Sequence, residues 1–170
     1  MHDRHATIST SIGELTLVAS DDALVGIYYP HHWVGLERAD RGDEVIAESD
    51  PVLSDAATQL REYLAGERTS FSITTAADGD DFQKRVWAIL DEIPFGETLT
   101  YGDIAEKLGD RSLARIVGKA VGSNPLSIIV PCHRVVGANG KLTGYAGGLE
   151  RKQHLLALEE APSAKAERLF

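Results

Sequence analysis

The stretch "TLTYGDIAEKLGDRSLARIVGKAVG", residues 98–122, decides the fold of the second half of the chain. Thr100 and Asp103 form a pair like a capping box, which marks the start of a helix, and Gly109 is placed to end that helix. Ser112 is placed to cap a second helix after a turn of about four residues, which is the spacing of a helix-turn-helix. The apolar face of the second helix is predicted to comprise Leu113, Ile116, Val117 and Ala120.

The second helix of this motif presents a row of positive charges. Arg111, Arg115 and Lys119 recur at intervals of four residues, so they project from one side of the helix. A helix face that is merely solvated more often mixes the two signs of charge, and this row contains no acidic residue. We interpret the row as a surface for nucleic-acid phosphates, with an ordinary solvated face as the alternative.

The formal charge of the whole chain, -9, argues at first against a nucleic-acid partner. Its distribution argues the other way. Residues 1–80 contain 5 Lys or Arg and 15 Asp or Glu, whereas residues 107–152 contain 8 basic and 2 acidic residues. This basic island comprises Lys107, Arg111, Arg115, Lys119, Arg134, Lys141, Arg151 and Lys152. A local basic region on an otherwise acidic protein is compatible with phosphate binding.

The first half of the chain begins with a pattern of strands. The runs "ELTLVAS" (14–20) and "ALVGIYY" (23–29) are rich in residues that favour strands, and two aspartates separate them. They predict a hairpin, and a further strand is predicted near Ile8. Residues 30–50 are polar and acidic and are predicted to form a loop.

A helix follows this loop, because Asp50 and Pro51 mark a helix start and Gly66 marks its end. The polar stretch "TTAADGDD" (74–81) then separates the two halves of the chain. We predict an α/β (α+β) fold, in which a β-rich N-terminal domain with one or more helices precedes a mostly helical C-terminal domain containing the helix-turn-helix. The predicted bounds are 1–77 for the N-terminal domain, 78–81 for the linker and 82–170 for the C-terminal domain.

Composition narrows the class of protein. Hydrophobic residues make up 43% and charged residues 25% of the 170 residues, which allows a core and argues against global disorder. A single cysteine excludes an internal disulfide and a multi-cysteine zinc site. The adjacent His31 and His32 have no second ligand pair nearby and are predicted to lie in an exposed loop, so no metal is expected. No run reaches the length of a signal-peptide core or a membrane span, so we expect a cytoplasmic protein without membrane contact.

The only cysteine, Cys132, lies in the apolar run "IIVPCHRVVG" (128–137). A buried structural cysteine is the simpler interpretation, and a nucleophile is the alternative. The preceding residues predict a buried strand that ends at Pro131, so Cys132 lies at the end of an element. Direct activation by His133 is awkward because adjacent side chains diverge, so a water molecule or a sharp turn has to connect them.

The C-terminal helix offers a partner for His133. Its inward face is predicted to comprise Leu149, Leu155 and Leu156. Glu159 projects between the last two of these, and a carboxylate on an apolar face is costly unless it is paired. The two alternatives are a His133–Glu159 pair and a solvent-exposed Glu159 in a frayed last turn.

The run "PCHRVVG" (131–137) resembles the active-site signature of the O6-alkylguanine-DNA alkyltransferases, also called methylated-DNA–protein-cysteine methyltransferases. The resemblance covers residues 82–160 and includes "FQKRVWAILDEIPFGETLTYGDIAEKLG", "ARIVGKAVGSNP" and "GKLTGYAGGLERKQHLLALE". It implies a DNA repair enzyme that flips O6-alkylguanine out of double-stranded DNA and transfers the alkyl group irreversibly to Cys132, once per molecule. The resemblance also implies no cofactor, O4-alkylthymine as a further candidate lesion, and a monomer in solution that can cluster on DNA.

The resemblance assigns roles to individual residues. Cys132 would accept the alkyl group. His133 would deprotonate the thiol of Cys132 through a water molecule, and Glu159 would orient His133. Tyr101 would crowd the phosphate and donate a proton to the departing guanine. Arg115 would fill the gap that the flipped base leaves.

Further residues are assigned to DNA binding and to the substrate pocket by the same resemblance. The remaining DNA contacts would be Arg111, Lys119 and Ser123. Asn124 would be a hinge between the helix-turn-helix and the cysteine segment. The pocket would be shaped by Pro131, Tyr145, Ala146, Gly147 and Gly148. Some relatives have a hydroxyl residue where this chain has Ala146, so one contact to O6 is not expected here. The front half also lacks the cysteines of the zinc site that some relatives contain.

Two other functions fit parts of the sequence. A non-catalytic protein that binds alkylguanine lesions would use the same DNA-binding features, but such relatives lack the cysteine. A cysteine hydrolase could use Cys132, His133 and Glu159, but it would leave the basic helix without a purpose. The mass of the protein after incubation with alkylated duplex distinguishes the three functions.

Overall fold

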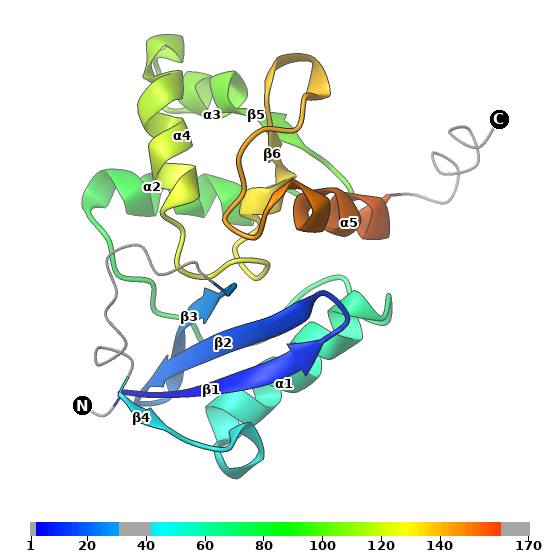
Figure 1. Cartoon of the computed structure of the whole chain (residues 1–170). Coiled ribbons are helices and arrows are strands. Elements are labelled where there is room, and N and C mark those ends of the chain that lie inside the picture. The colour runs from blue at the N-terminus through cyan, green and yellow to red at the C-terminus, as the bar shows by residue number, and fades with distance from the viewer. Residues whose placement is uncertain (1–2, 31–41, 161–170) are drawn as a thin grey trace, which may run out of the picture.

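The computed structural model describes residues 3–30 and 42–160. A β-sheet with a helix on one face forms the N-terminal part, and a group of helices forms the C-terminal part (Figure 1). The sheet has four strands in the order β3-β2-β1-β4. The strands are β1 (Asp3–Thr10), β2 (Gly13–Ser20), β3 (Ala23–Tyr28) and β4 (Asp43–Glu44). Successive strands of the β1-β2-β3 meander are antiparallel, and β4 lies parallel to β1.

The predicted hairpin and the predicted strand near Ile8 are confirmed. The turn between β1 and β2 is short, and Gly13 adopts a φ of 107°, which glycine tolerates better than other residues. Strand β2 lies in the middle of the meander, which accounts for its unbroken run of buried residues at 15–19. The loop predicted for 30–50 is wrong for its described part, because β4 and a 3-10 turn (Ala47–Ser49) form there.

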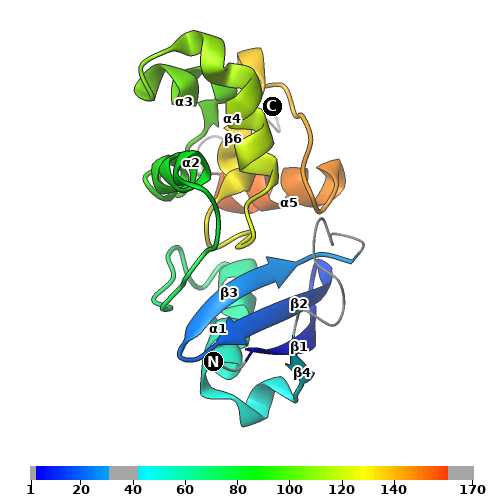
Figure 2. The same ribbon diagram turned by 90° about the vertical axis from the view of Figure 1, so that its left-hand side faces the viewer.

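Helix α1 (Pro51–Leu64) lies across one face of the sheet (Figure 2). The carboxylate of Asp50 accepts hydrogen bonds from the N–H groups of Val52 and Leu53, so the predicted cap is confirmed. Pro51 occupies the first helical position, where a missing N–H costs nothing. The buried apolar side chains of the helix recur at helical spacing and complete the core with the sheet; they are Leu53, Ala56, Ala57, Leu60, Tyr63 and Leu64.

The C-terminal domain is built from helices and one short pair of parallel strands. The helices are α2 (Asp81–Asp91), α3 (Tyr101–Lys107), α4 (Ala114–Gly122) and α5 (Leu149–Glu159), and the strands are β5 (Leu99–Thr100) and β6 (Val135–Val136). Three 3-10 turns lie at Arg111–Leu113, Cys132–Arg134 and Ala138–Gly140. None of the helices within 3–30 and 42–160 is long and apolar enough to cross a membrane.

Helices α3 and α4 form the predicted helix-turn-helix. Thr100 and Asp103 cap α3 reciprocally, as predicted. The predicted cap at Ser112 is wrong, because the carboxylate of Asp110 accepts from both the N–H and the hydroxyl of Ser112. Ser112 therefore lies inside a 3-10 turn, and α4 begins only at Ala114.

The apolar face of α4 is narrower than predicted. Val117, Ala120 and Val121 are buried, and their spacing defines one stripe of the helix. Ile116 is 47% exposed, so its predicted place on the buried face is wrong. Neighbouring helical residues point about 100° apart, which turns Ile116 away from the stripe that Val117 occupies.

The first residues of the stretch 74–81 are attached to the sheet. The N–H of Leu24 in β3 donates to the Thr74 carbonyl, and the N–H of Ala76 donates to the Leu24 carbonyl. The stretch then leads into α2, whose cap is Asp80. The domain bounds stated above stay predictions, and residues 161–170 lie outside the described part of the chain.

Candidate active site

Cys132 lies at the end of a series of tight turns. The strand predicted to end at Pro131 is wrong, because the backbone groups of this segment bond to near neighbours along the chain. The N–H of Ile129 donates to the Ser127 carbonyl at 2.9 Å, which is a γ-turn contact. This turn holds Ile128 at a φ of 76°, an uncommon conformation for a β-branched residue.

Asn124 holds the two ends of these turns together. Its side-chain N–H donates to the Val130 carbonyl at 2.9 Å, and its side-chain oxygen accepts from the Leu126 N–H at 3.0 Å. The Val130 carbonyl also accepts from the Cys132 N–H at 2.7 Å. Because Asn124 is 2% exposed, water does not compete for these bonds. The cysteine-bearing segment is thereby fixed by one buried amide.

His133 and Glu159 form a buried pair. His133 Nε2 lies 2.7 Å from Glu159 Oε2, and both side chains are almost completely buried. The frayed, solvent-exposed alternative for Glu159 is wrong, because α5 extends to this residue and buries it. Arg134 donates to the same carboxylate, with Nε 2.7 Å from Oε1 and Nη2 3.0 Å from Oε2.

These contacts set the protonation of the pair. Burial alone would raise the pKa of Glu159, but the hydrogen bonds from His133 and Arg134 lower it to about 2. Burial lowers the pKa of His133 in spite of the opposing effect of Glu159, so the imidazole rests neutral. Its Nε2–H donates to the carboxylate, which leaves the lone pair on Nδ1. Within the described residues no protein atom forms a hydrogen bond with Nδ1.

The thiol of Cys132 is protonated at rest. Burial raises its pKa, whereas the side chain of Asn124 and the charge of Lys152 oppose that rise. Lys152 is fully buried in α5, and its Nζ donates to the Thr143 carbonyl at 2.7 Å. The thiol therefore needs a base before it can act as a nucleophile.

Cys132 opens on a pocket of about 270 Å³ between the helix-turn-helix and the loop before α5. The lining residues are Tyr101, Gly118, Val121, Gly122, Asn124, Ser127, Cys132, Gly144, Tyr145 and Ala146. The hydroxyl of Tyr101, at the start of α3, accepts a hydrogen bond from Thr143 Oγ1 at 3.2 Å, which orients it. Three lining glycines leave room for a planar group to approach the thiol.

The resemblance assigns three further residues to the pocket, but they do not line it. They lie around it instead. Pro131 is part of the turn that carries the cysteine, and Gly148, with a φ of 89°, starts α5. Gly147 is buried against Tyr29 of the N-terminal domain, whose ring lies 2.8 Å from where a Cβ would be. The hydroxyl of Tyr29 also lies 2.6 Å from that of Tyr145, so the N-terminal domain supports the pocket wall.

Some residues of the site are absent from the sequence-based predictions. The burial of Lys152 could have been predicted from its position in the sequence. It precedes Leu155 by three residues and Glu159 by seven, so it lies on the same buried face of the helix. Tyr63, whose hydroxyl donates to Glu159, and Tyr29 could not be predicted in this way, because their contacts join distant parts of the chain. Leu149 was predicted on the inward face of α5, and this is wrong because it is 48% exposed at the first turn.

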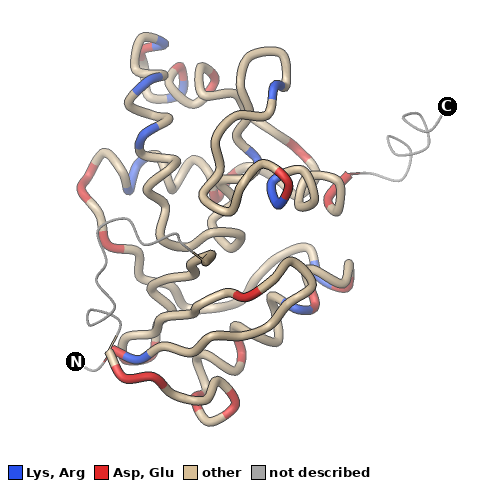
Figure 3. The backbone as a smooth tube through the Cα atoms, viewed as in Figure 1, with Lys and Arg blue, Asp and Glu red and all other residues tan. Residues whose placement is uncertain are grey.

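Not all the cations of the basic island are available on the surface of the protein. Arg134 and Lys152 are buried, and Arg151 donates to the carbonyls of Ile12 and Gly147. These three cations therefore serve the protein interior or the contact between the domains. Positions with Lys or Arg lie along α4 (Figure 3), and Arg115 and Lys119 of this helix are exposed.

The row of cations on α4 is only partly as predicted. Arg115 and Lys119 lie exposed on α4. Arg111 precedes the helix and forms an ion pair with Glu106 of α3 at 2.8 Å, so an acidic residue does reach the row. Ser123 is exposed after α4, where its hydroxyl donates to the Ala120 carbonyl. His31 and His32 lie outside the described residues, and within those described no three His, Cys, Asp or Glu side chains could hold a metal ion.

Comparison with known proteins places the chain in a family. Residues 81–161 match a model described as "6-O-methylguanine DNA methyltransferase, DNA binding domain". Residues 4–77 match a model described as "6-O-methylguanine DNA methyltransferase, ribonuclease-like domain". The chain belongs to the methylated-DNA–protein-cysteine methyltransferase family. The methyltransferase thus has the two-part organisation predicted above, a sheet-and-helix domain before a helical DNA-binding domain.

Individual relatives match this methyltransferase over nearly its whole length. It is 45% identical over 166 residues to the methylated-DNA–protein-cysteine methyltransferase of Mycolicibacterium paratuberculosis, which covers 98% of each chain. It is 44% identical over 155 residues to the protein of the same name from Methanosarcina acetivorans, over 91% of this chain and 97% of that one. The crystal structure of Mycobacterium tuberculosis OGT in complex with DNA matches it with a TM-score of 0.82 at 43% identity, over 92% of both chains.

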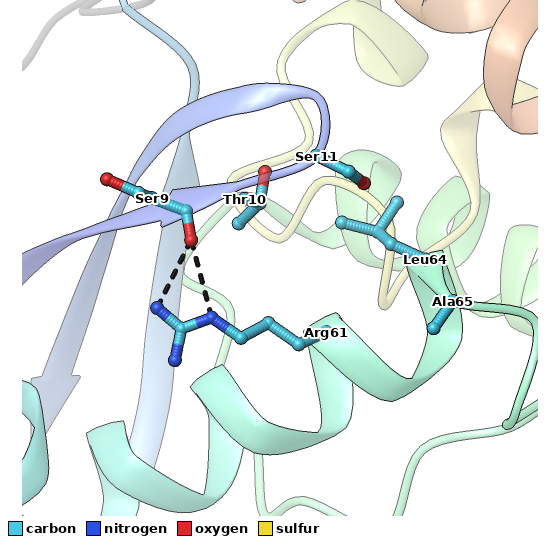
Figure 4. Close-up of a pocket in the computed structure, with 6 residues that line it drawn as sticks. All are labelled: Ser9, Thr10, Ser11, Arg61, Leu64 and Ala65. Carbon is cyan, nitrogen blue, oxygen red and sulfur yellow. Dashed lines mark hydrogen bonds between the residues drawn. The ribbon is translucent and has the colours of Figure 1, made fainter.

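The methyltransferase has a larger pocket, of about 360 Å³, at the far end of α1 (Figure 4). Its lining residues are Ser9, Thr10, Ser11, Arg61, Leu64 and Ala65. Arg61 donates two hydrogen bonds to the Ser9 carbonyl and is therefore occupied within the N-terminal domain. This pocket contains no cysteine, so the smaller pocket at Cys132 is the candidate active site.

Proposed function

We propose that this methyltransferase repairs O6-alkylguanine in double-stranded DNA by moving the alkyl group onto Cys132. The observation that carries the proposal is that the only cysteine of the chain lines a pocket beside the helix-turn-helix. The sulfur of Cys132 bonds to the alkyl carbon while the bond between that carbon and O6 breaks, and the departing guanine gains a proton. A thioether has no hydrolysable bond, so each molecule acts once, and no cofactor is needed.

The neutral His133 is the base in this proposal. A water molecule relays the proton of Cys132 to His133 Nδ1, because Nε2 already donates to Glu159. The charged Glu159 then stabilises the imidazolium that forms. The charge of Lys152 and the amide of Asn124 stabilise the thiolate, since both favour its charged form.

The pocket supplies the proton for the leaving group. Tyr101 lies in the pocket lining with Cys132, and its hydroxyl is oriented by Thr143. It therefore serves as the proton donor to the guanine. Tyr145 and Ala146 form the wall against which the base lies.

DNA binds along α4. Cys132 is buried, so the target base has to leave the stack to reach it, which costs a few kcal/mol. Arg115 offsets part of this cost by filling the vacated space. Lys119 contacts phosphate, as does Ser123, while Arg111 contributes less because it is paired with Glu106.

Several finer features belong to the same proposal. O4-alkylthymine is a second lesion of the same chemical class, since it also carries an alkyl group on an exocyclic oxygen. The protein acts as a monomer that can cluster on DNA, and its compartment is the cytoplasm. Metal ions take no part in the reaction as proposed.

Intact-mass measurement after incubation with duplex DNA containing O6-methylguanine tests the proposal. We expect the mass of one methyl group to be added per molecule, on the peptide that contains Cys132. Unmodified duplex and the variant Cys132→Ser should give no adduct, while the variant keeps its affinity for unmodified DNA. Binding without an adduct would indicate a lesion-binding protein instead, and repeated turnover would indicate a hydrolase.

A further inference from the structure

A tyrosine of the N-terminal domain contacts the acid–base pair of the C-terminal domain. Tyr63 lies near the end of α1, is 1% exposed, and donates a hydrogen bond from its hydroxyl to Glu159 Oε2. The same hydroxyl oxygen lies 3.4 Å from His133 Nε2. Glu159 Oε2 therefore accepts hydrogen bonds from both domains, since His133 Nε2 and Arg134 Nη2 of the C-terminal domain also donate to it.

We propose that Tyr63 is a positioning residue for alkyl transfer. Its hydroxyl holds Glu159 Oε2 in the orientation that fixes the tautomer of His133, and it limits how strongly the carboxylate attracts a proton onto the imidazole. This inference rests on the proposed roles of Cys132, His133 and Glu159. It gives the N-terminal domain a part in the chemistry that is separate from DNA binding.

The ring of Tyr63 is fixed from both domains. Its centroid lies 5.3 Å from that of Phe71 in the segment after α1, and 6.3 Å from that of Phe95, between α2 and β5, in an edge-on contact. Burial raises the pKa of Tyr63 well above its usual range, so the phenol stays a protonated donor. The hydroxyl of Tyr63 is therefore held in one orientation, toward Glu159, and stays protonated.

The charges around the imidazole decide the direction of the effect. Glu159 is the negative group that faces His133, whereas Arg134 and Lys152 are positive and Tyr63 is neutral. Tyr63 stabilises the carboxylate of Glu159 by a hydrogen bond. This hydrogen bond weakens the attraction of the carboxylate for a proton on His133. Without this hydroxyl the carboxylate pulls more strongly on His133, so the imidazole is protonated at a higher pH and no longer accepts the proton of the thiol.

The variant Tyr63→Phe tests the proposal, because it removes the hydroxyl and keeps the ring. We expect the acid limb of the transfer rate to move to higher pH and the plateau rate to fall about fivefold, which corresponds to the loss of one hydrogen bond. The effect should be equal for alkylated duplex and for free O6-alkylguanine base, since Tyr63 acts on the chemistry. Alkylation of Cys132 by a small thiol reagent should show the same shift in pH without any DNA.

Leu53→Ala is the matched control, since Leu53 is fully buried on the same helix and, as an apolar side chain, forms no hydrogen bond with Glu159. It should lower stability and leave the pH profile unchanged. An unchanged profile in Tyr63→Phe, or an equal shift in Leu53→Ala, would overturn the positioning role. The wild-type protein has to form the adduct on Cys132 in the same series, so a failure of the proposed function is seen separately from a failure of this inference.

Discussion

Glu159 is the residue on which the electrostatics of the site depend. Its carboxylate accepts hydrogen bonds from the side chains of Tyr63, His133 and Arg134, and from the N–H of Gly96 at 3.4 Å. A buried charge is stable only when its hydrogen-bonding capacity is filled in this way. The carboxylate therefore remains charged at neutral and mildly acidic pH.

Replacing Glu159 by Gln should move the acid limb of the transfer rate in the direction opposite to that expected for Tyr63→Phe. The variant removes the charge that raises the proton affinity of His133, so the limb moves to lower pH. The plateau rate should fall by about a hundredfold, because the imidazolium loses its counter-charge. Transfer rates measured by quenching the reaction at several times over a range of pH give both the acid limb and the plateau rate. An unchanged rate would show that Glu159 takes no part in the mechanism.

The same residue predicts a dependence of stability on pH. The pKa of Glu159 is about 2 in the folded protein and about 4.3 when unfolded, so its contribution is complete above pH 4.3 and is lost as the pH falls towards 2. The difference in unfolding free energy between wild type and Glu159→Gln should be constant near neutral pH and shrink across that window. Denaturant unfolding at several pH values measures it, and a constant difference would contradict the assignment.

Lys152 should control the reactivity of the thiol through its charge. Lys152→Met keeps much of the side-chain volume and removes the cation, so the pKa of Cys132 should rise and alkylation at neutral pH should slow. The pH dependence of reaction with a small thiol reagent measures this. Lys119→Met, on the exposed side of α4, is the control and should leave the thiol unaffected.

At the scale of the element, α4 has two functional sides. Val117 and Ala120 attach it to the domain core, and Gly118 and Gly122 border the pocket. The exposed side carries Arg115, together with Lys119. One short helix thus connects the proposed DNA-binding surface directly to the space in front of the thiol.

Substitutions of Lys119 and Arg115 should therefore have different effects, the first on DNA affinity and the second on the rate of transfer from duplex DNA. Lys119→Ala should weaken binding to any duplex and reduce the slope of affinity against salt by about one charge. Arg115→Ala should slow transfer from duplex DNA far more than transfer from free O6-alkylguanine base, which needs no flipping. Equal slowing with both substrates would place Arg115 in the chemistry or in the fold.

The elements that sequence could predict are those with local signals. Asp50 with Pro51 and Thr100 with Asp103 mark helix starts because a cap needs only its own neighbours. The turns around Ile128 could not be predicted, since an apolar run has the same composition whether it forms a strand or a buried turn. The candidate site residues near the cysteine are predictions from the resemblance, whereas contacts between the domains have no periodic signature in the sequence.

At the scale of the whole molecule, the two domains are joined through the site. The Ile27 N–H of β3 donates to the Pro125 carbonyl beside the cysteine segment at 2.8 Å. Arg151 of α5 donates to the Ile12 carbonyl at 2.7 Å, and its guanidinium lies over the ring of Tyr29. The N-terminal domain is therefore a support for the candidate active site.

Gly147→Ala should weaken this junction. The new methyl group would lie 2.8 Å from the ring of Tyr29, which is held by Arg151 and by Tyr145 and has little room to move. We expect a loss of about 1–3 kcal/mol in stability, measured by thermal or denaturant unfolding. Gly144→Ala is the control, because nothing lies within 4 Å of its Cβ position. Similar unfolding of the two variants would contradict this account of the junction.

The unequal charge of the two halves gives the molecule an electric dipole. Residues 1–80 hold 15 acidic and 5 basic residues, whereas Lys and Arg positions follow α4 at the other end of the molecule (Figure 3), and Arg115 and Lys119 of this helix are exposed. In the field of a polyanion such a dipole experiences a torque, so the molecule turns α4, the proposed DNA-binding helix, forward before any contact is made. The field extends only about 8 Å at physiological salt, which restricts this alignment to the last approach. A larger fraction of collisions then begins in a productive orientation, and this suits a protein that can use each of its molecules only once.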